Sequence, residues 1–375
     1  MKIIILVRIL WTSGAQKIAI KEAQTLTQLG HEVKLVFLRE TESGKLLEPS
    51  LASLDYEIFS TRKPRWIYST ITGMFMPDRK GEGALDYNLL QDYPKTVTQN
   101  EADLIICHDP WAGIAGYRIN KKLNIPYSIF YHEGISGEYP IPLLGRFAKR
   151  TEENVLKNAS KVFGVTTKVA NSVRRVYDVE VLPNFPGMNL QGYDIFNDKQ
   201  DVLIASATWD KNRDPTKYID ILERLPDFTL YIVGRWRSVS EYQDFLNLLI
   251  YKKISNRVVI EDRISESKLQ NLYKKAKFNL RYGTNEMGLG TSNIESISHL
   301  TPIVVDSVLG ISDLIMEYGG GGVVDTWNPV NVSTFIRENN NELNYQKLQN
   351  QLLKMVKQFT WEKHANTLLD IRTGV

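Results

Sequence analysis

The chain has 375 residues, 43% of them hydrophobic and 24% charged, which is enough for two globular domains that each bury a core. Its net charge of +3 is too small to predict binding to nucleic acid, and its five histidines form no cluster with metal-ligand spacing. No segment reaches the ~18 apolar residues that a membrane-spanning helix needs. The single cysteine, Cys107, excludes an intramolecular disulfide and favours a reducing compartment, so we expect a cytoplasmic protein.

The first half of the chain alternates strand and helix patterns. Arg8 interrupts the first apolar run and no small-residue cleavage site follows, so residues 2–7 predict a β-strand rather than a signal peptide. Residues 15–29 have the apolar spacing of a helix, which Gly30 ends. Further strands are predicted at 33–38, 104–107, 126–131 and 162–165, and a further helix up to about 122. This alternation predicts a parallel sheet covered by helices on both faces.

The segment 61–80 interleaves basic residues with Trp66, Tyr68 and Phe75. Basic and aromatic residues together suit an anionic interface such as a membrane surface or a lipid phosphate. A long surface loop with a small hydrophobic plug is the alternative.

The alternation stops at 181–189, where two prolines and a glycine predict a linker, and then it restarts. Strands are predicted at 202–206, 229–233, 258–260, 277–281, 302–305 and 322–325, helices at 217–225, 241–250 and 266–276, and a helical tail from 343 to the end. We therefore predict an α/β protein with two tandem Rossmann-like domains that face a central cleft. The first covers 1–187, the second covers 188–355, and a C-terminal helix over 356–375 packs back on the first.

The most informative stretch is RYGTNEMGLGTSNIESISHLTPIVV, residues 281–305. A buried strand leads into a glycine-rich loop and then a helix that begins at Thr291–Ser292, and such helix N-termini suit a phosphate. Glu286 and Glu295 flank the loop with carboxylates that accept hydrogen bonds from hydroxyl groups. The pattern fits a nucleotide-sugar site. It also fits a structural capping box, in which Ser292 and Glu295 satisfy each other's backbone N–H groups.

Ligands of parallel sheets bind outside the carboxyl ends of the strands. His132 ends a predicted strand there, and an imidazole at such a place can share or shuttle a proton. Asp109 precedes a proline, so we expect it to cap a helix. The candidate segments are 8–14, 108–109, 132–134, 206–213, 234–237, 262–264 and 281–290.

Seven segments in the right order carry a family likeness. They are SGAQKIAIKEAQTLTQLGHEV (13–33), ADLIICHDPWAG (102–113), FYHEG (130–134), KVFGVTTKVANSV with VLPNF (161–185), FTLYIVG (228–234), RVVIEDRISESKLQNLYKKAKFNL (257–280) and 281–305. Together they span nearly the whole chain and resemble glycosyltransferase family 4, which has the two-domain GT-B fold.

The resemblance implies a retaining transferase that needs no metal ion and no further cofactor. It would move a hexose from a nucleoside-diphosphate sugar of the UDP or GDP type to a glycan or lipid-linked acceptor, with peripheral membrane contact through 61–80. An alternative is a non-catalytic subunit that binds nucleotide sugars. Another is a nucleotide-sugar 2-epimerase of the same fold.

The resemblance also implies roles for single residues. Gly14 would approach the diphosphate or the acceptor, and His132 would contact the transferred sugar or its acceptor. Glu286 would bind the sugar and Glu295 the ribose hydroxyls. The backbone amides from Gly288 through Leu289, Gly290 and Thr291 to Ser292 would hold the diphosphate, and the base would lie near Arg263 and Ile264.

Two departures from the family pattern matter. Seven residues separate the family's glutamates, whereas eight lie between Glu286 and Glu295, so the loop has a bulge or its sugar-binding carboxylate has been replaced. The family's arginine after the first strand of the second domain is also missing. Arg213 is therefore expected to hold the diphosphate, with Lys211 second, unless both are solvated loop charges.

Overall fold

The computed structural model describes residues 1–60, 83–134, 142–192, 196–262, 264–284 and 286–370. The chain divides into two compact units. The first is Met1–Pro186 together with the segment from Trp361 onward, and the second is Gly187–Thr360. The division thus falls one residue before the predicted boundary, and the returning segment begins at Trp361 rather than at 356.

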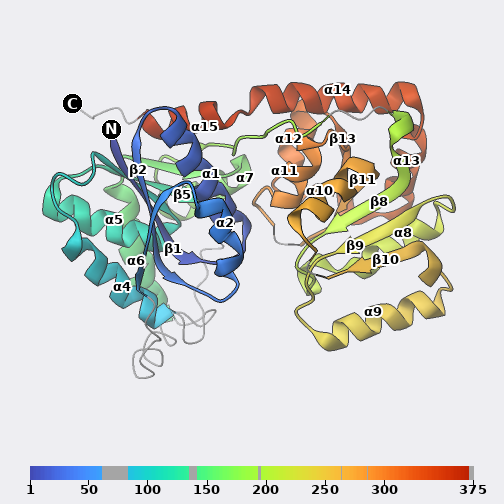
Figure 1. Ribbon diagram of the computed structural model, residues 1–375. Coiled ribbons are helices and arrows are strands. Elements are labelled where there is room, and N and C mark those ends of the chain that lie inside the picture. Colours follow the sequence, from blue (N-terminus) through green and yellow to red (C-terminus); the bar gives the residue numbers. More distant parts are fainter. Residues whose placement is uncertain (61–82, 135–141, 193–195, 263, 285, 371–375) are drawn as a thin grey trace. The chain divides into compact units, whose positions relative to one another are not determined.

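The first unit contains a seven-stranded parallel sheet of order β3-β2-β1-β4-β5-β6-β7. Its strands are β1 (Lys2–Leu10), β2 (Glu32–Glu40), β3 (Asp55–Ser60), β4 (Leu104–His108), β5 (Tyr127–Tyr131), β6 (Lys161–Gly164) and β7 (Leu182–Pro183). Its helices are α1 (Gly14–Gln28), α2 (Glu48–Leu51), α4 (Gly83–Thr96), α5 (Pro110–Leu123), α6 (Pro142–Lys157), α7 (Thr167–Tyr177) and α15 (Trp361–Leu369), with a 3₁₀ turn η1 (Gly44–Leu47) (Figure 1).

The second unit contains a six-stranded parallel sheet of order β10-β9-β8-β11-β12-β13. Its strands are β8 (Gln200–Ser206), β9 (Thr229–Val233), β10 (Val258–Glu261), β11 (Ala276–Arg281), β12 (Ile303–Asp306) and β13 (Gly321–Val324). Its helices are α8 (Ile219–Glu223), α9 (Val239–Tyr251), α10 (Glu266–Lys275), α11 (Thr291–Ser298), α12 (Ser312–Tyr318), α13 (Pro329–Asn339) and α14 (Glu342–Gln358). Short 3₁₀ turns are η2 (Phe196–Asp198), η3 (Lys211–Arg213), η4 (Pro215–Tyr218), η5 (Ser255–Arg257) and η6 (Asp325–Trp327).

Two helices that were predicted to be continuous are each interrupted in the structure. The helix expected at 217–225 is divided into η4 and α8, because Asp214 caps a turn that opens with a proline. The helical tail is broken between α14 and α15. There the Phe359 carbonyl accepts a hydrogen bond from the backbone N–H of Met188, 2.7 Å away, instead of one from the next helical turn.

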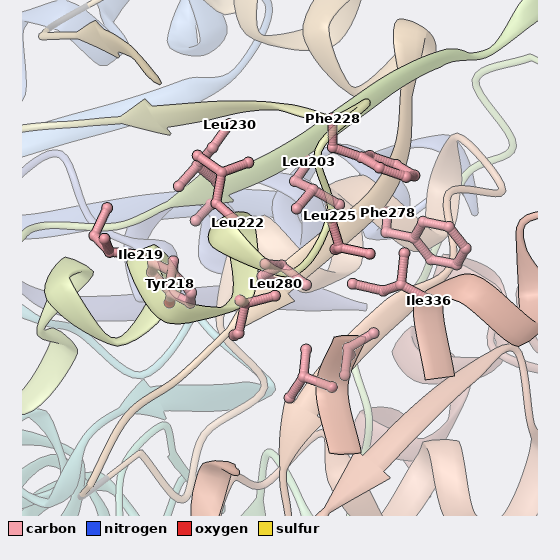
Figure 2. Close-up of a cluster of buried hydrophobic side chains, with 14 of the residues drawn as sticks. Leu203, Tyr218, Ile219, Leu222, Leu225, Phe228, Leu230, Phe278, Leu280 and Ile336 are labelled. Atoms are coloured by element: carbon pink, nitrogen blue, oxygen red, sulfur yellow. The ribbon is translucent and has the colours of Figure 1, made fainter. Parts of the chain in front are cut away.

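The larger hydrophobic cluster of the second unit lies between its sheet and helices that include α8 and α13. Figure 2 shows side chains from β8, β9 and β11 meeting those of α8 and of α13. Leu280 of β11 is fully buried in this cluster. Strands covered on both faces are apolar along their whole length, which is why their positions could be predicted from apolar runs.

A buried carboxylate joins three distant segments of the first unit. Glu22 of α1 is fully buried, and its Oε2 lies 2.7 Å from Nε2 of His108, the last residue of β4. Its Oε1 lies 2.7 Å from Nε2 of His364 in α15. Burial alone would raise the pKa of Glu22, but its interactions with His108 and then His364 hold this pKa far below the usual value. The carboxylate therefore stays ionised and fastens α15 to the sheet.

We expect Leu280→Ala to lower the free energy of unfolding by about 2–5 kcal/mol, because it removes buried contacts and leaves a cavity. Leu343→Ala makes the same chemical change where the side chain is 78% exposed, and its effect should stay within about 0.5 kcal/mol. Urea unfolding followed by tryptophan fluorescence measures both. Equal losses would contradict the packing described for β11.

The ionisation of Glu22 should make stability depend on pH. Its pKa is lowered in the folded state, so its contribution is present above the unfolded value of about 4.3 and is lost as the pH falls below it. At pH 7 we expect Glu22→Gln to lower the free energy of unfolding by about 1.5–3 kcal/mol, with a gap to wild type that closes below about pH 4. Urea titrations from pH 3 to 8 measure this gap, with the exposed Glu362→Gln as control. A gap that is constant with pH would show that Glu22 is not ionised.

Candidate functional site

Three charged side chains meet at the carboxyl ends of β8 and β11 in the second unit. Arg281 ends β11, and its Nη2 donates to both carboxylate oxygens of Glu286 at 2.6 Å, while its Nη1 donates to the Ser206 carbonyl at 2.8 Å. Arg213 of η3 donates from Nε to Oε1 of Glu286 at 2.5 Å. The structure therefore brings Glu286 and Arg213 together and adds Arg281.

The electrostatics of this arginine–glutamate cluster favour an anion. Burial alone would raise the pKa of Glu286, but the charges of Arg281 and then Arg213 hold it below its usual value. Burial lowers the pKa of Arg281, but the Glu286 carboxylate more than offsets this and raises it. Within these three residues, two guanidinium cations face one carboxylate, and the Arg213 side chain is 25% exposed.

Helix α11 follows this cluster and begins at Thr291, as predicted. Its N-cap is Gly290, whose φ of +68° is a conformation that glycine adopts without strain. The capping-box interpretation was wrong, because Gly290 has no side chain and Ser292 lies inside the helix. The N-terminal amides of α11 have no side-chain cap from Gly290, which suits the anion-binding interpretation.

The loop that carries Glu286 is held by a glycine that the sequence did not single out. The backbone N–H of Gly310 donates to the Glu286 carbonyl at 2.9 Å. A Cβ atom at Gly310 would collide with the Met287 carbonyl and lie 2.8 Å from the Gly288 carbonyl oxygen. Only glycine allows this close approach. Nothing in the sequence distinguishes Gly310 from an ordinary turn glycine, whereas Arg281 could have been noticed as a charge that ends an apolar strand.

Glu295 lies in the middle of α11 and is partly buried. Burial and then the Glu295 charge raise the pKa of the Tyr273 phenol well above its usual value, while the Arg281 charge acts in the opposite direction. Both Glu295 and Arg281 are therefore close enough to Tyr273 to act on it. The two predicted carboxylates thus belong to one region of the second unit.

The other predicted residues of the second unit lie in different surroundings. Lys211 is exposed on η3. Leu289 is buried, whereas Gly288 and Thr291 are partly exposed. Ile264 packs against a small cluster that includes Leu272 and Tyr273, and Arg263 lies outside the described residues.

In the first unit, Gly14 is the first residue of α1, directly after strand β1 and its loop. Asp109 caps α5 as predicted, since its side chain accepts from the Ala112 N–H at 2.8 Å. His132 follows β5, and its Nε2 lies 2.8 Å from Nδ1 of His108. The two rings stack with centroids 5.0 Å apart. Sequence reasoning left His108 undecided, because its partners Glu22 and His364 are remote in the chain.

Burial and then the neighbouring His108 lower the pKa of His132 to about 3, so its ring is neutral at physiological pH. The Nδ1 atom of His132 is buried and has no hydrogen-bond partner among the residues that the structure describes. A buried acceptor without a partner costs about 1–3 kcal/mol.

Among the described residues, no group of three or more His, Cys, Asp or Glu side chains could hold a metal ion. In that part of the chain, too, every helix is too short or too polar to cross a bilayer. The predicted membrane segment 61–80 lies outside the described residues, so its role stays a prediction.

Three solved structures similar to this chain share its architecture along almost their whole length. HepE of Anabaena in complex with UDP-glucose is 16% identical with a TM-score of 0.74, and the match covers 99% of this chain and 98% of that one. Sucrose-phosphate synthase of Thermosynechococcus elongatus is 15% identical with a TM-score of 0.73, covering 99% and 98%. A mutant of S. aureus TarM in complex with fondaparinux, alpha-GlcNAc-glycerol and UDP is 11% identical with a TM-score of 0.74, covering 100% of both chains.

A comparison with curated protein sequences gave no significant match. Residues 12–185 match the family model described as Glycosyltransferase Family 4, which confirms the resemblance inferred from the motifs. The two parallel sheets and the structural neighbours confirm the predicted GT-B fold. The chain therefore has the GT-B fold, and residues 12–185 of its first unit match glycosyltransferase family 4.

Proposed function

We propose that the chain transfers a hexose from a nucleoside-diphosphate sugar to a hydroxyl group of a glycan or lipid-linked acceptor, with retention of configuration and without a metal ion or other cofactor. The observation that carries the donor part is the arginine–glutamate cluster, in which two guanidinium cations face one carboxylate before the N-terminus of α11. Guanidinium groups and helix N-terminal amides bind phosphates through charge-assisted hydrogen bonds. The solved complexes of HepE with UDP-glucose and of TarM with UDP support a UDP-type donor over a GDP-type one.

In this proposal Arg213 and Arg281 neutralise the diphosphate, helped by the amides from Gly288 to Ser292. Glu295 accepts hydrogen bonds from the ribose hydroxyls and Glu286 from the sugar. The base lies near Arg263 and Ile264. Arg281 brings a guanidinium charge to the end of β8, where the family arginine is missing, since its Nη1 donates to the Ser206 carbonyl.

The chemistry needs little from the protein beyond position and charge. The acceptor hydroxyl oxygen bonds to the anomeric carbon on the face that the diphosphate leaves, and the bond from that carbon to the phosphate oxygen breaks. The hydroxyl proton passes to the same phosphate oxygen. Fixed cations around the leaving group then stabilise the charge that develops on it.

The acceptor is assigned to the first unit, with His132 contacting the acceptor or the transferred sugar and Gly14 giving close backbone approach. The segment 61–80 would add a lipid-phosphate or membrane contact on the cytoplasmic side. This part of the proposal is supported by the basic and aromatic composition of that segment.

We expect one UDP-sugar to stabilise the wild-type protein in the presence of EDTA, by about 2.7 kcal/mol at 100 times its dissociation constant. Glu295→Ala should weaken donor binding about a hundredfold or more, since two charge-assisted hydrogen bonds of about 1.5–3 kcal/mol each are lost. Thermal shift and calorimetric titration measure both, with the exposed Glu338→Ala as control. Unchanged affinity in Glu295→Ala would exclude the assigned ribose site.

Tight binding of a nucleotide sugar without transfer would favour the non-catalytic binding subunit. An epimer formed without an acceptor would favour the 2-epimerase.

Arg213 and Lys211 provide a matched pair, because they lie two residues apart on η3 but only Arg213 bonds to Glu286. We expect Arg213→Gln to lower kcat/KM about 10²–10³-fold, because a donor to the leaving diphosphate is removed. Lys211→Gln should change it less than about threefold. The dissociation constant of UDP should rise in Arg213→Gln as well. If only the affinity for the intact nucleotide sugar falls, Arg213 acts on Glu286 and not on the diphosphate.

A further inference from the structure

The hydrogen-bond partners of His364 determine where its protons lie. Its Nδ1 is 3.0 Å from the backbone carbonyl of Phe185, which can only accept, so Nδ1 carries a proton. The amide of Asn184 is oriented by its own hydrogen bond to the His364 carbonyl, which turns Oδ1 toward the same Nδ1. Nε2 of His364 faces Oε1 of Glu22, and one proton lies between them.

Glu22 is ionised, because its interactions with the two histidines lower its pKa, so its other carboxylate oxygen carries no proton. Oε2 can therefore only accept, and its partner is Nε2 of His108 at 2.7 Å. His108 must then donate from Nε2. In the neutral imidazole this makes Nδ1 of His108 an acceptor.

The constraint passes on to His132. Its Nε2 lies 2.8 Å from Nδ1 of His108, so Nε2 must donate and carries the ring proton. Nδ1 of His132 is then unprotonated, and this is the buried atom that has no partner among the described residues. The neutral state of the ring, which burial and His108 favour, agrees with this order of protons.

We propose that Glu22 and His108 are positioning residues that hold His132 in the tautomer protonated at Nε2, so that its Nδ1 accepts a hydrogen bond from a hydroxyl group of the sugar or its acceptor. This inference rests on the role proposed for His132 in transfer. It gives that role a direction. Nδ1 of His132 accepts a hydrogen bond from a hydroxyl group and has no proton to donate to the leaving phosphate. The leaving phosphate must therefore take its proton from the acceptor hydroxyl.

The wild-type protein provides the first test, which needs neither substrate nor variant activity. Long-range ¹H–¹⁵N spectra of protein labelled in its histidine side chains distinguish protonated from unprotonated ring nitrogens, and the five histidines can be assigned by substituting each in turn. We expect His108 and His132 to be protonated at Nε2 alone, and His364 to keep the proton on Nδ1. A proton on Nδ1 of His132, or a mixture of its tautomers, would overturn the proposal.

Two substitutions at one position give the second test. Glu22→Gln keeps an oxygen for His108 and offers an N–H to His364, so the tautomer of His132 should be retained. Glu22→Leu removes the oxygen that accepts from Nε2 of His108. His108 can then carry its proton on Nδ1 and donate to Nε2 of His132, which moves the ring proton of His132 to Nδ1. We expect kcat to fall about tenfold or more in Glu22→Leu, within the range of a lost acid–base contact, with KM for the donor unchanged, and to fall much less in Glu22→Gln.

Gln24→Leu, on the same helix but outside the network, controls for changes in α1. Equal kcat in Glu22→Leu and Gln24→Leu, with both folded, would overturn the positioning role and leave the transferase function intact. If wild type transfers no sugar from any donor, the proposed function fails, whereas the spectra still decide the tautomer. If Glu22→Leu does not fold, the wild-type spectrum alone decides.

Discussion

The first unit depends on one buried charge. A carboxylate such as that of Glu22 is costly to remove from water, and the cost is offset only when cations and hydrogen-bond donors surround it. Here the donors are supplied by the end of β4 and by α15, so both the sheet and the returning helix contribute to compensating the charge on α1. The same bonds that compensate the charge fix the orientation of the histidine rings. The same hydrogen bonds therefore stabilise the first unit and fix the orientation and tautomer of the His132 ring.

The two units treat buried charge in different ways. In the first unit the proton shared by Glu22 and His364 closes the network, which leaves an uncharged acceptor at His132. In the second unit Glu286 balances only one of the two arginines that it contacts, so one guanidinium of this cluster has no carboxylate of its own there. A neutral acceptor suits a hydroxyl group, and an unbalanced cation suits a phosphate. The division of labour proposed for the two units follows from this difference in charge balance.

The sequence predicted the fold well, because the strands of both sheets are buried on both faces and appear as continuous apolar runs. It also located the start of α11 and the helix cap at Asp109, since both depend on residues that are adjacent in the chain. It failed where the deciding contact is remote. Glu22 and His364 lie 342 residues apart, and no local pattern connects them. The break at Phe359 depends on a hydrogen bond from Met188, so no proline or glycine marked it.

The same limit applies to the candidate site. The spacing of Glu286 and Glu295 left open which loop residue provides the carboxylate, because a loop's course is set by what it packs against. In the structure that contact is the backbone of Gly310, beyond the next strand. The role of Arg281 was similarly hidden, since its partner on β8 belongs to a neighbouring strand and not to a neighbouring position in the sequence.

The return of the chain to the first unit also bears on the order of events during synthesis. The ribosome releases Glu22 long before His364, the histidine that completes its surroundings and emerges 342 residues later. Until then the Glu22 carboxylate would have only one of its two histidine partners, His108. Water would hydrate its other oxygen, so α1 would not yet be fully packed. The second unit, whose charged cluster is contained within one continuous stretch, has no such delay. The first unit would thus reach its final packing only after the second unit has been made.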